Sequence, residues 1–389
     1  MRSNSVHSAA RRLGGVVATA TTIALLAAGC GSSDDDGAST TPAGSGGGAT
    51  SAGLDEARTP TPNAYEGPTD PVRKPARLTI GIVTCSSQLS GCVSAADGIE
   101  EAARAAGFTP RMYDGGGTPQ KQNAAILDAI SAGADVVATT AIDPNLVQQG
   151  LRAARRAGVL VVSGSNGIDS PNPVREPEAG KLGYAFDVAP DYAELGRKAA
   201  AWIIGDSDGK ANVGLFSDRQ FPSVIAFEEG LLEGLEQCGD CTVSEPQTFN
   251  GTQVGTTLGN QTTGFLRSNP DVDYVFSPYD PAAAAQVTAI AQAGMANRVK
   301  IVGVLGSQQN LEFIRQGQVQ AADAAYDNRY MGYMVVDGII RTLARAPLFR
   351  PHGGNLPGVI LDETNLPEAG RDWTADFDYV SEFTSLWRG

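Results

Sequence analysis

The chain has 389 residues, of which 42% are hydrophobic and 19% charged, and its formal net charge is −14. Such an acidic chain repels polyanions, which disfavours nucleic acid and anionic lipid as partners. It contains two histidines, and His7 lies in a leader that we expect to be removed. A Ser-His-Asp triad, a Cys-His pair or a multi-histidine metal site would then depend on His352 alone. That residue lies in a Pro- and Gly-rich stretch typical of a surface loop, so we expect no catalytic residue, no metal and no cofactor.

The first thirty residues have the pattern of an export signal. Three arginines precede a mostly apolar run at residues 16–28, and small residues then lead to Cys30. The apolar run is too short to span a membrane comfortably. Its end resembles a bacterial lipobox, so we interpret residues 1–29 as a lipoprotein signal peptide and Cys30 as the lipidated residue. An ordinary secretory signal with a chance cysteine is the alternative. Loss of the three arginines takes the net charge of −14 to −17.

The next segment, residues 30–75, is rich in Gly, Ser, Thr, Pro and Asp and has almost no large apolar residue. Such a composition buries too little surface to offset the entropy of ordering the chain. We therefore predict a disordered tether that holds a folded domain away from the membrane.

Four further cysteines form two locally spaced pairs, Cys85 with Cys92 and Cys238 with Cys241. In an oxidising compartment each pair is expected to form a disulfide that closes a small loop. A zinc site is the competing interpretation, but the spacing lacks the pattern of a zinc ribbon.

From residue 76 onward, short β-branched runs alternate with amphipathic helical segments. This alternation is typical of parallel sheets with helical crossovers. Thr118-Pro119 and Asp143-Pro144 are expected to open helices, and glycines are expected to close them. Four β-α units are expected in the first lobe, and three of their strands are placed, at 78–83, 135–139 and 159–162.

A second series of the same kind runs from about residue 183 to residue 326. Its strands are expected near residues 212–216, 242–245, 272–276, 300–304 and 319–324. The two series echo one another, since residues 135–144 and 273–281 each place a strand before a turn whose Asp and Pro start a helix. We therefore predict an α/β fold of two doubly wound parallel-sheet lobes. In such sheets ligands collect outside the carboxyl ends of the strands, so the site is expected in the cleft between the lobes.

Several short stretches in this order resemble the type 1 periplasmic binding proteins of the ribose and galactose group. They are Ile80-Gly81-Ile82, Gly98-Ile99-Glu100-Glu101-Ala102-Ala103, Asp114-Gly115-Gly116, Ile142-Asp143-Pro144 and Gly332-Tyr333. The likeness runs from about residue 77 to residue 365 and is specific as a whole rather than in any one motif. It implies the substrate-binding component of an ABC importer with a three-strand hinge.

The resemblance also implies where the chain passes between the lobes. The crossings are expected near residues 182–186, near residue 326 and near residues 349–358. The predicted organisation is a first lobe of 76–183 with 327–350, a second lobe of 184–326 with 351–365, and a C-terminal extension of 366–389.

The likeness weakens at the positions that hold sugar in this family. Relatives usually carry Asp-Arg after the fourth strand, where this chain has Ser165-Asn166, and Asp where it has Leu305-Gly306. A buried Asp or Arg makes charge-assisted bonds to sugar hydroxyls, each worth about 1.5–3 kcal/mol. We therefore expect a polyol, a modified sugar or another small polar molecule rather than a pentose bound in the usual manner.

Nine residues at the expected cleft are the candidate ligand-binding residues. Each has a purely structural alternative: ordering of the disulfide loop for the first two, helix anchoring for the phenylalanine, hinge packing for the second tyrosine and helix capping for the first aspartate. The second aspartate could instead pair with Arg329. The candidates are Ser87, Gln88, Ser165, Asn166, Phe221, Tyr279, Asp280, Tyr326 and Asp327.

The function expected from these features is capture of a small polar solute (a sugar, a polyol or a sugar-like molecule) without catalysis. A monomeric, lipid-anchored protein on the outer face of the cell membrane, or in the periplasm, would hand its solute to the permease of an ABC importer. A ligand-sensing lipoprotein read by a membrane receptor is one alternative. An enzyme that acts on a sugar derivative through Asp280, Asp327 or a free thiol is another.

Overall fold

The computed structural model describes residues 53–168, 179–350 and 355–388. The predicted signal peptide, Cys30, the first part of the predicted tether and His352 lie outside these residues. Within the described ranges, no helix combines the length and apolar composition needed to cross a bilayer.

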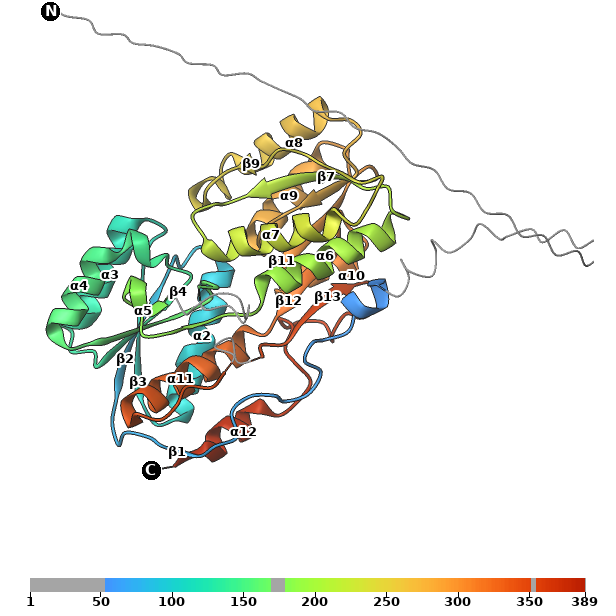
Figure 1. Cartoon of the computed structure of the whole chain (residues 1–389). Coiled ribbons are helices and arrows are strands. Elements are labelled where there is room, and N and C mark those ends of the chain that lie inside the picture. The colour runs from blue at the N-terminus through green and yellow to red at the C-terminus, as the bar shows by residue number, and fades with distance from the viewer. Residues whose placement is uncertain (1–52, 169–178, 351–354, 389) are drawn as a thin grey trace, which may run out of the picture. The chain divides into compact units, whose positions relative to one another are not determined.

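The first lobe is built on a five-stranded parallel sheet whose strand order is β3-β2-β4-β5-β6 (Figure 1). Helices α2 and α11 pack on one face and α3 and α4 lie on the other, as the predicted doubly wound arrangement requires. The strands are β2 (Thr79–Thr84), β3 (Thr109–Asp114), β4 (Val136–Thr140), β5 (Leu160–Gly164) and β6 (Asp187–Val188). The helices are α2 (Ser90–Ala105), α3 (Pro119–Ser131), α4 (Gln148–Ala157), the short α5 (Ala179–Leu182) and α11 (Asn328–Ala344).

The second lobe has a seven-stranded sheet with the order β13-β12-β11-β10-β7-β8, in which β9 also pairs with β7. All neighbours are parallel except β12 and β13, which run antiparallel. The strands are β7 (Asn212–Ser217), β8 (Thr242–Val243), β9 (Gln247–Thr248), β10 (Tyr274–Phe276), β11 (Lys300–Leu305), β12 (Gln320–Tyr326) and β13 (Gly358–Asp362). The helices are α6 (Tyr192–Asp206), α7 (Pro222–Leu235), α8 (Leu258–Ser268), α9 (Asp280–Gln292) and α10 (Gln308–Arg315).

The predicted boundary signals act as expected at several elements. Thr118 caps α3 by accepting a hydrogen bond from Lys121 N, and Pro119 is the first residue of that helix. Gly158 ends α4 in the left-handed conformation, with φ of 70°. Strand β3 was not predicted from the sequence, because it is an edge strand whose side chains are mostly exposed and show no apolar run.

The chain passes between the lobes beside β12. The first passage follows β6, a few residues after the expected 182–186, because Asp187 and Val188 still pair with β5. The second lies between β12 and α11, at Asp327, and the third lies between α11 and β13. The α/β fold of two doubly wound lobes, predicted from the alternating pattern, is confirmed.

Both ends of the described chain add links between the lobes. The tether was predicted to continue to residue 75, whereas the structure folds residues 53–75 onto the lobes. Thr61 pairs with Gly358 at the edge of the second sheet, and β1 (Val72–Arg73) pairs with β14 (Trp387–Arg388) beside α12 (Tyr379–Leu386), where blue and red meet in Figure 1. Composition missed this because the segment is held by backbone pairing and by hydrogen bonds to distant side chains rather than by burial of many apolar side chains.

The C-terminal segment covers α11 with aromatic side chains. Tyr330 lies at the centre of this group, with its ring centroid 5.1 Å from that of Tyr379 and 5.5 Å from that of Phe383. Tyr65 joins the group from the N-terminal segment, 5.8 Å from Phe383. Edge-to-face aromatic pairs of this kind stabilise beyond the area they bury. The two terminal segments are therefore packed parts of the folded protein.

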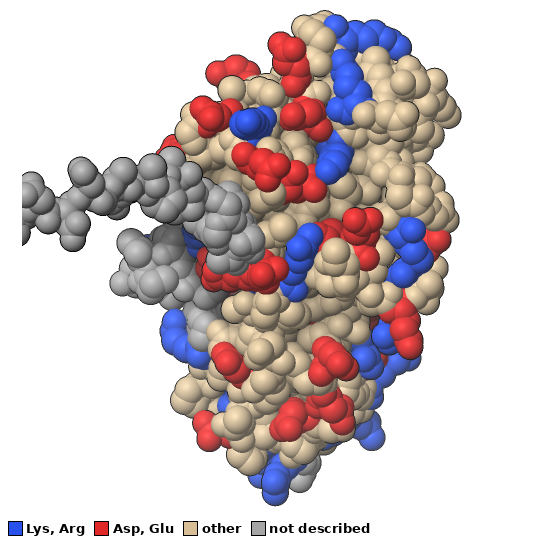
Figure 2. Space-filling model, turned by 90° about the vertical axis from the view of Figure 1, so that its right-hand side faces the viewer, with Lys and Arg blue, Asp and Glu red and all other residues tan. Residues whose placement is uncertain are grey.

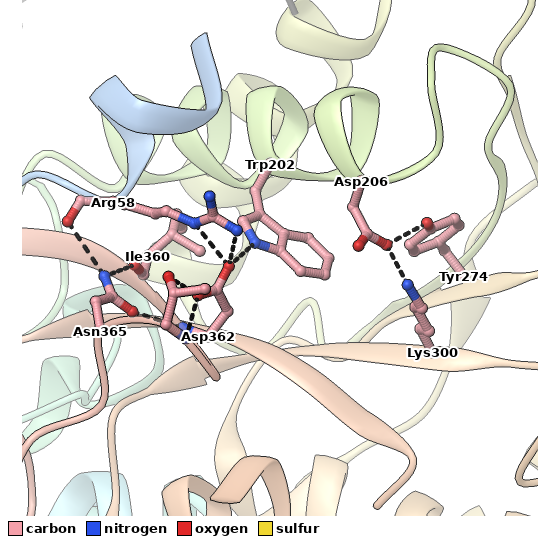
Figure 3. Close-up of polar contacts among 9 residues, drawn as sticks. Arg58, Trp202, Asp206, Tyr274, Lys300, Ile360, Asp362 and Asn365 are labelled. Atoms are coloured by element: carbon pink, nitrogen blue, oxygen red, sulfur yellow. Dashed lines mark hydrogen bonds and ion pairs between the residues drawn. The ribbon is translucent and has the colours of Figure 1, made fainter. Parts of the chain in front are cut away.

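Figure 3 shows how the N-terminal segment is tied to the second lobe. Asp362, at the end of β13, accepts hydrogen bonds from Arg58 Nε at 2.8 Å and from Trp202 Nε1 at 2.7 Å. Asn365 donates to the carbonyl oxygens of Arg58 and Ile360. Burial acts to raise the pKa of Asp362, but the hydrogen bonds from Thr364, Trp202 and Arg58 together hold that pKa below its usual range.

The acidic and basic side chains share the surface on the face shown in Figure 2. Lys and Arg side chains lie among Asp and Glu side chains there rather than in an area of their own. This face therefore presents no continuous basic surface of the kind that a polyanion requires.

Replacement of Asp362 by Asn should lower the free energy of unfolding by about 1–3 kcal/mol at pH 7, because a buried charge-assisted cluster is lost. A carboxyl group with a lowered pKa stabilises above its unfolded-state pKa and loses that effect as the pH falls through its folded-state pKa. The difference between variant and wild type should therefore shrink at pH 3, measured by urea unfolding. Asp206→Asn is the control, because its ion-pair partner Lys300 is half-exposed and an amide oxygen there can still accept from Tyr274, so the change should cost under about 1 kcal/mol. Equal losses in the two variants would contradict this account.

Candidate functional site

Three strand ends meet at the cleft between the lobes. Ala141 follows β4, Ser165 follows β5 and Leu305 is the last residue of β11. All three have positive φ, at 50°, 67° and 135°, a region that non-glycine residues seldom occupy. Backbone strain of this kind collects at functional sites, where the surrounding structure fixes it. The carboxyl ends of both sheets therefore form one strained rim.

A pocket with a free volume of about 50 Å³ lies at this rim, between the two lobes. Most of its lining is apolar or aromatic, and none of the described residues that line it carries a charge. The lining residues are Leu89, Gly91, Cys92, Ala141, Ser165, Tyr192, Phe221, Ser223, Val224, Phe227, Pro278, Tyr279, Pro281, Val304, Leu305 and Tyr326.

Three hydroxyl groups from three elements meet on one side of the pocket. Ser165 Oγ and Tyr192 OH are 3.0 Å apart, and Tyr192 OH donates to Tyr326 OH at 3.5 Å. The two tyrosine rings meet edge to face, with centroids 5.6 Å apart. Burial raises the pKa of both phenols, so these groups stay neutral. The row can both donate to and accept from a neutral polar ligand.

Aromatic rings form the side of the pocket that belongs to the second lobe. The ring of Tyr279 lies 5.9 Å from those of Phe221 and Phe249, edge-on to the first and tilted to the second. Its hydroxyl donates to Asp218 Oδ2 at 2.9 Å. Burial raises the pKa of Asp218, and the carboxyl group is not among those that line the pocket. Tyr279 thus offers the pocket an aromatic face while its proton is engaged elsewhere.

The structure brings four of the nine predicted site residues together. Ser165, Phe221, Tyr279 and Tyr326 all line this pocket. Gln88 lines a neighbouring pocket of about 140 Å³, which shares Leu89, Ala141 and Phe221 with the first.

Two more of the predicted residues lie outside both pockets. Ser87 is exposed, and its hydroxyl donates to Asp114 at 2.7 Å. Asn166 is fully buried, and its amide nitrogen donates to Ile142 O and to Ser163 Oγ. Its position after β5 agrees with the switch point of the sheet, but its side chain turns into the lobe.

The two predicted aspartates are also bonded within the protein. Asp327 caps α11 by accepting from Tyr330 N, and its second oxygen accepts from Ala375 N at 2.9 Å. Asp327 lines neither pocket, and the guanidinium of Arg329, its other predicted partner, bonds to Glu101 instead. Asp280 begins α9 and is described separately below.

Asp280 forms a buried pair of acids with Asp323. Asp280 Oδ2 accepts from Ser307 N at 2.7 Å, and Asp323 Oδ1 accepts from Gly306 N at 2.8 Å, so the pair holds the loop that follows Leu305. A Cβ at Gly303 would lie 2.9 Å from one oxygen of each acid, so only glycine leaves room for them there. Burial, followed by the neighbouring acid, raises the pKa of Asp280, and burial raises that of Asp323 to about 6.

Both predicted disulfides are present. Cys85 and Cys92 are joined across the loop that enters α2, and Cys92 lines the pocket. Cys238 and Cys241 are joined in the turn after α7, and neither lines the pocket. The first disulfide thus orders one wall of the pocket, which agrees with a stiffened loop beside a ligand.

Sequence reasoning missed several lining residues. Tyr192 was not among the predicted residues; it is the first residue of α6, which follows the first passage between the lobes. Val224 and Phe227 follow Phe221 at helical spacing on α7, so that spacing was a usable signal. Pro278 and Pro281 were assigned only to the start of a helix.

Comparison with known proteins gives a consistent result. A family model described as "Periplasmic binding protein domain" matches residues 80–344. The chain is 23% identical over 273 residues to the ribose import binding proteins of Salmonella typhimurium and Salmonella typhi, covering 68% of this chain and 86% of each relative.

Solved structures share the fold. An ABC transporter solute-binding protein from Mycobacterium smegmatis with bound glycerol has a TM-score of 0.61 and 22% identity, covering 77% of this chain and 100% of that one. A solute-binding protein from Agrobacterium vitis bound to α-D-tagatopyranose has a TM-score of 0.65 and 18% identity, covering 75% and 96%.

The acid pair should make stability fall as the pH rises. Carboxyl groups with raised pKa stabilise fully below the unfolded-state pKa near 4, and each loses up to about 1.4 kcal/mol per pH unit above it until the folded-state pKa is reached. Asp280→Asn removes one such group, and its amide can donate to Asp323, so urea unfolding between pH 5 and pH 8 should show a flatter profile than wild type. Asp323→Asn is the matched contrast, because both oxygens of Asp323 accept hydrogen bonds and an amide there meets a donor. It should destabilise at every pH. A profile for Asp280→Asn as steep as that of wild type would contradict the raised pKa of this acid pair.

Proposed function

The chain belongs to the periplasmic binding protein family, and from that premise we propose that it is an extracytoplasmic solute-binding lipoprotein of an ABC importer. It captures a small, uncharged, polar solute of the sugar or polyol class between its lobes and delivers it to a membrane permease. The observation that carries the proposal is the pocket at the carboxyl ends of both sheets, where groups from each lobe face one small volume.

The relatives support this class of solute. The sequence relative is named for ribose import, and the two solved structures hold glycerol and a ketohexose. A row of neutral hydroxyls beside aromatic faces suits such a molecule, since hydroxyls exchange hydrogen bonds and rings stack on C–H faces. The lobes are joined by short segments at β12, which is the arrangement that lets lobes close on a ligand.

The chemistry of the pocket favours capture over catalysis. The alternative is an enzyme that acts on a sugar derivative through Asp280, Asp327 or a free thiol. Both aspartates are engaged by backbone amides of their own chain, and Cys85 and Cys92 are joined. The described residues thus supply the pocket with no general acid, base or nucleophile among its charged or thiol groups.

The export signal supports the location. Cleavage before Cys30 and lipid attachment to its sulfur would hold the protein at the outer face of the cell membrane. One lipid-anchored tether leaves the lobes free to open and close beside a permease.

Loss of one hydroxyl in the row should weaken solute binding without unfolding the protein. Tyr326→Phe removes a neutral hydrogen bond worth about 0.5–1.5 kcal/mol, so the Kd should rise by roughly threefold to tenfold. A thermal-shift screen of sugars and polyols identifies the solute, and calorimetry then compares the variants. Tyr333→Phe is the control, because that hydroxyl bonds to Glu101 and lies outside the pocket. Unchanged affinity in Tyr326→Phe would remove the hydroxyl row from the site.

The lipid anchor has a direct test in cells. Cys30→Ser should abolish incorporation of radiolabelled fatty acid and release the protein from the membrane fraction, since serine cannot form the thioether. Ser32→Ala, two residues away, should retain both label and membrane association. Membrane association of Cys30→Ser equal to that of Ser32→Ala would show that another feature holds the protein there.

A further inference from the structure

Three of the pocket's hydroxyl groups are gathered on one side. Ser165, Tyr192 and Tyr326 supply a row of hydroxyls where β5, α6 and β12 meet. Two of the three hydroxyl protons are used along the row, so it presents one free donor and several lone pairs. The hydroxyl groups of a ligand can therefore form hydrogen bonds along this row.

The opposite wall is mostly hydrocarbon. Phe221, Val224 and Phe227 line it from the start of α7, and Val304 and Leu305 line it from the end of β11. These five side chains have no polar atom. Ser223 of α7 also lines the pocket and adds one hydroxyl group to this otherwise apolar wall.

The backbone on this wall is poor in donors as well. Pro278 and Pro281 both line the pocket, and proline has no N–H. Between them, the hydroxyl of Tyr279 donates its hydrogen bond to Asp218, and the carboxyl group of Asp280 accepts from Ser307. The turn after β10 therefore presents the rings of Pro278, Tyr279 and Pro281 to the pocket, rather than backbone amides and carboxyl groups.

Leu305 closes the apolar wall against the first lobe. A Cβ on Gly91 of α2 would lie 2.8 Å from Leu305 Cδ1, so the leucine side chain reaches across the cleft to that helix. Its strained backbone is fixed by the acid pair, which binds the amides of Gly306 and Ser307 directly after it. A strained backbone conformation at Leu305 thus directs a hydrocarbon side chain at the pocket.

We propose that the solute carries its hydroxyl groups on one edge and a hydrocarbon face or methyl group on the other, as a deoxygenated sugar does. This inference rests on the proposed function, because it names the ligand class of the same pocket. The uneven distribution of hydrogen-bonding groups is what selects against a fully hydroxylated sugar.

The energetic reason is the cost of an unpaired hydroxyl. A hydroxyl pressed against the apolar wall loses its water and gains no partner, whereas a methyl group at that place gains contact. A hydrocarbon pocket discriminates against an added hydroxyl by roughly tenfold to a hundredfold. The deoxygenated member of a matched pair should therefore bind at least about tenfold more tightly than its parent.

Matched sugar pairs test this directly on the purified mature protein. Calorimetry would compare D-galactose with D-fucose, L-mannose with L-rhamnose, and D-glucose with 6-deoxy-D-glucose, since each pair differs by one oxygen. A tenfold or greater preference for the deoxy member in at least one pair supports the inference. Binding without preference, or with preference for the parent, overturns it and leaves solute capture standing. If no member of any pair binds, both the inference and the proposed sugar class fail.

A variant of the wall provides a second readout. Val224→Thr keeps the shape of the side chain and places one hydroxyl on the apolar wall, so it should reduce the preference for the deoxy sugar by about threefold or more. Val287→Thr is the matched control, because Val287 is equally buried in the same lobe on α9 and does not line the pocket. It should leave the ratio unchanged. Equal effects of the two variants on the ratio would show that the wall does not set the preference.

Discussion

Parallel pairing of strands is the constraint on which the rest of this molecule depends. It places the carboxyl ends of β4 and β5 at one edge of the first sheet and that of β11 at one edge of the second. Because β12 ends where the chain returns to the first lobe, the two edges face each other. The groups that line the pocket lie on these strand ends and on the turns and helices next to them, so strand direction fixes where the site is.

The charged side chains near this site lie outside the pocket, in the framework around it. Asp280 and Asp323 share a buried position beneath the loop after Leu305, and Asp218 holds the hydroxyl of Tyr279. Asp362 ties the N-terminal segment to the second sheet (Figure 3). Buried acids of this kind fix geometry when their hydrogen bonds are satisfied. What they leave to the solute is a neutral row of hydroxyls and an apolar wall.

The terminal segments make the connection between the lobes broader than three strands. Residues 53–75 bond to β13 and pair with β14, while the C-terminal segment packs its aromatic rings on α11. Trp373 N donates to Gly306 O, so the same segment also reaches the loop beside the pocket. These two segments therefore limit how far the lobes can open.

The sequence by itself determined the alternating α/β architecture, the two lobes, the two disulfides and four of the pocket residues. These follow from hydrophobic periodicity, helix caps and cysteine spacing, which are local properties. Tertiary structure alone decided that Asp280 and Asp327 serve the framework, that Tyr192 joins the pocket and that residues 53–75 are ordered. Each of these depends on which distant group occupies the same place: Asp323 beside Asp280, Ala375 beside Asp327, β14 beside β1. No local pattern encodes such encounters, because they arise only when the lobes and both chain ends have packed together.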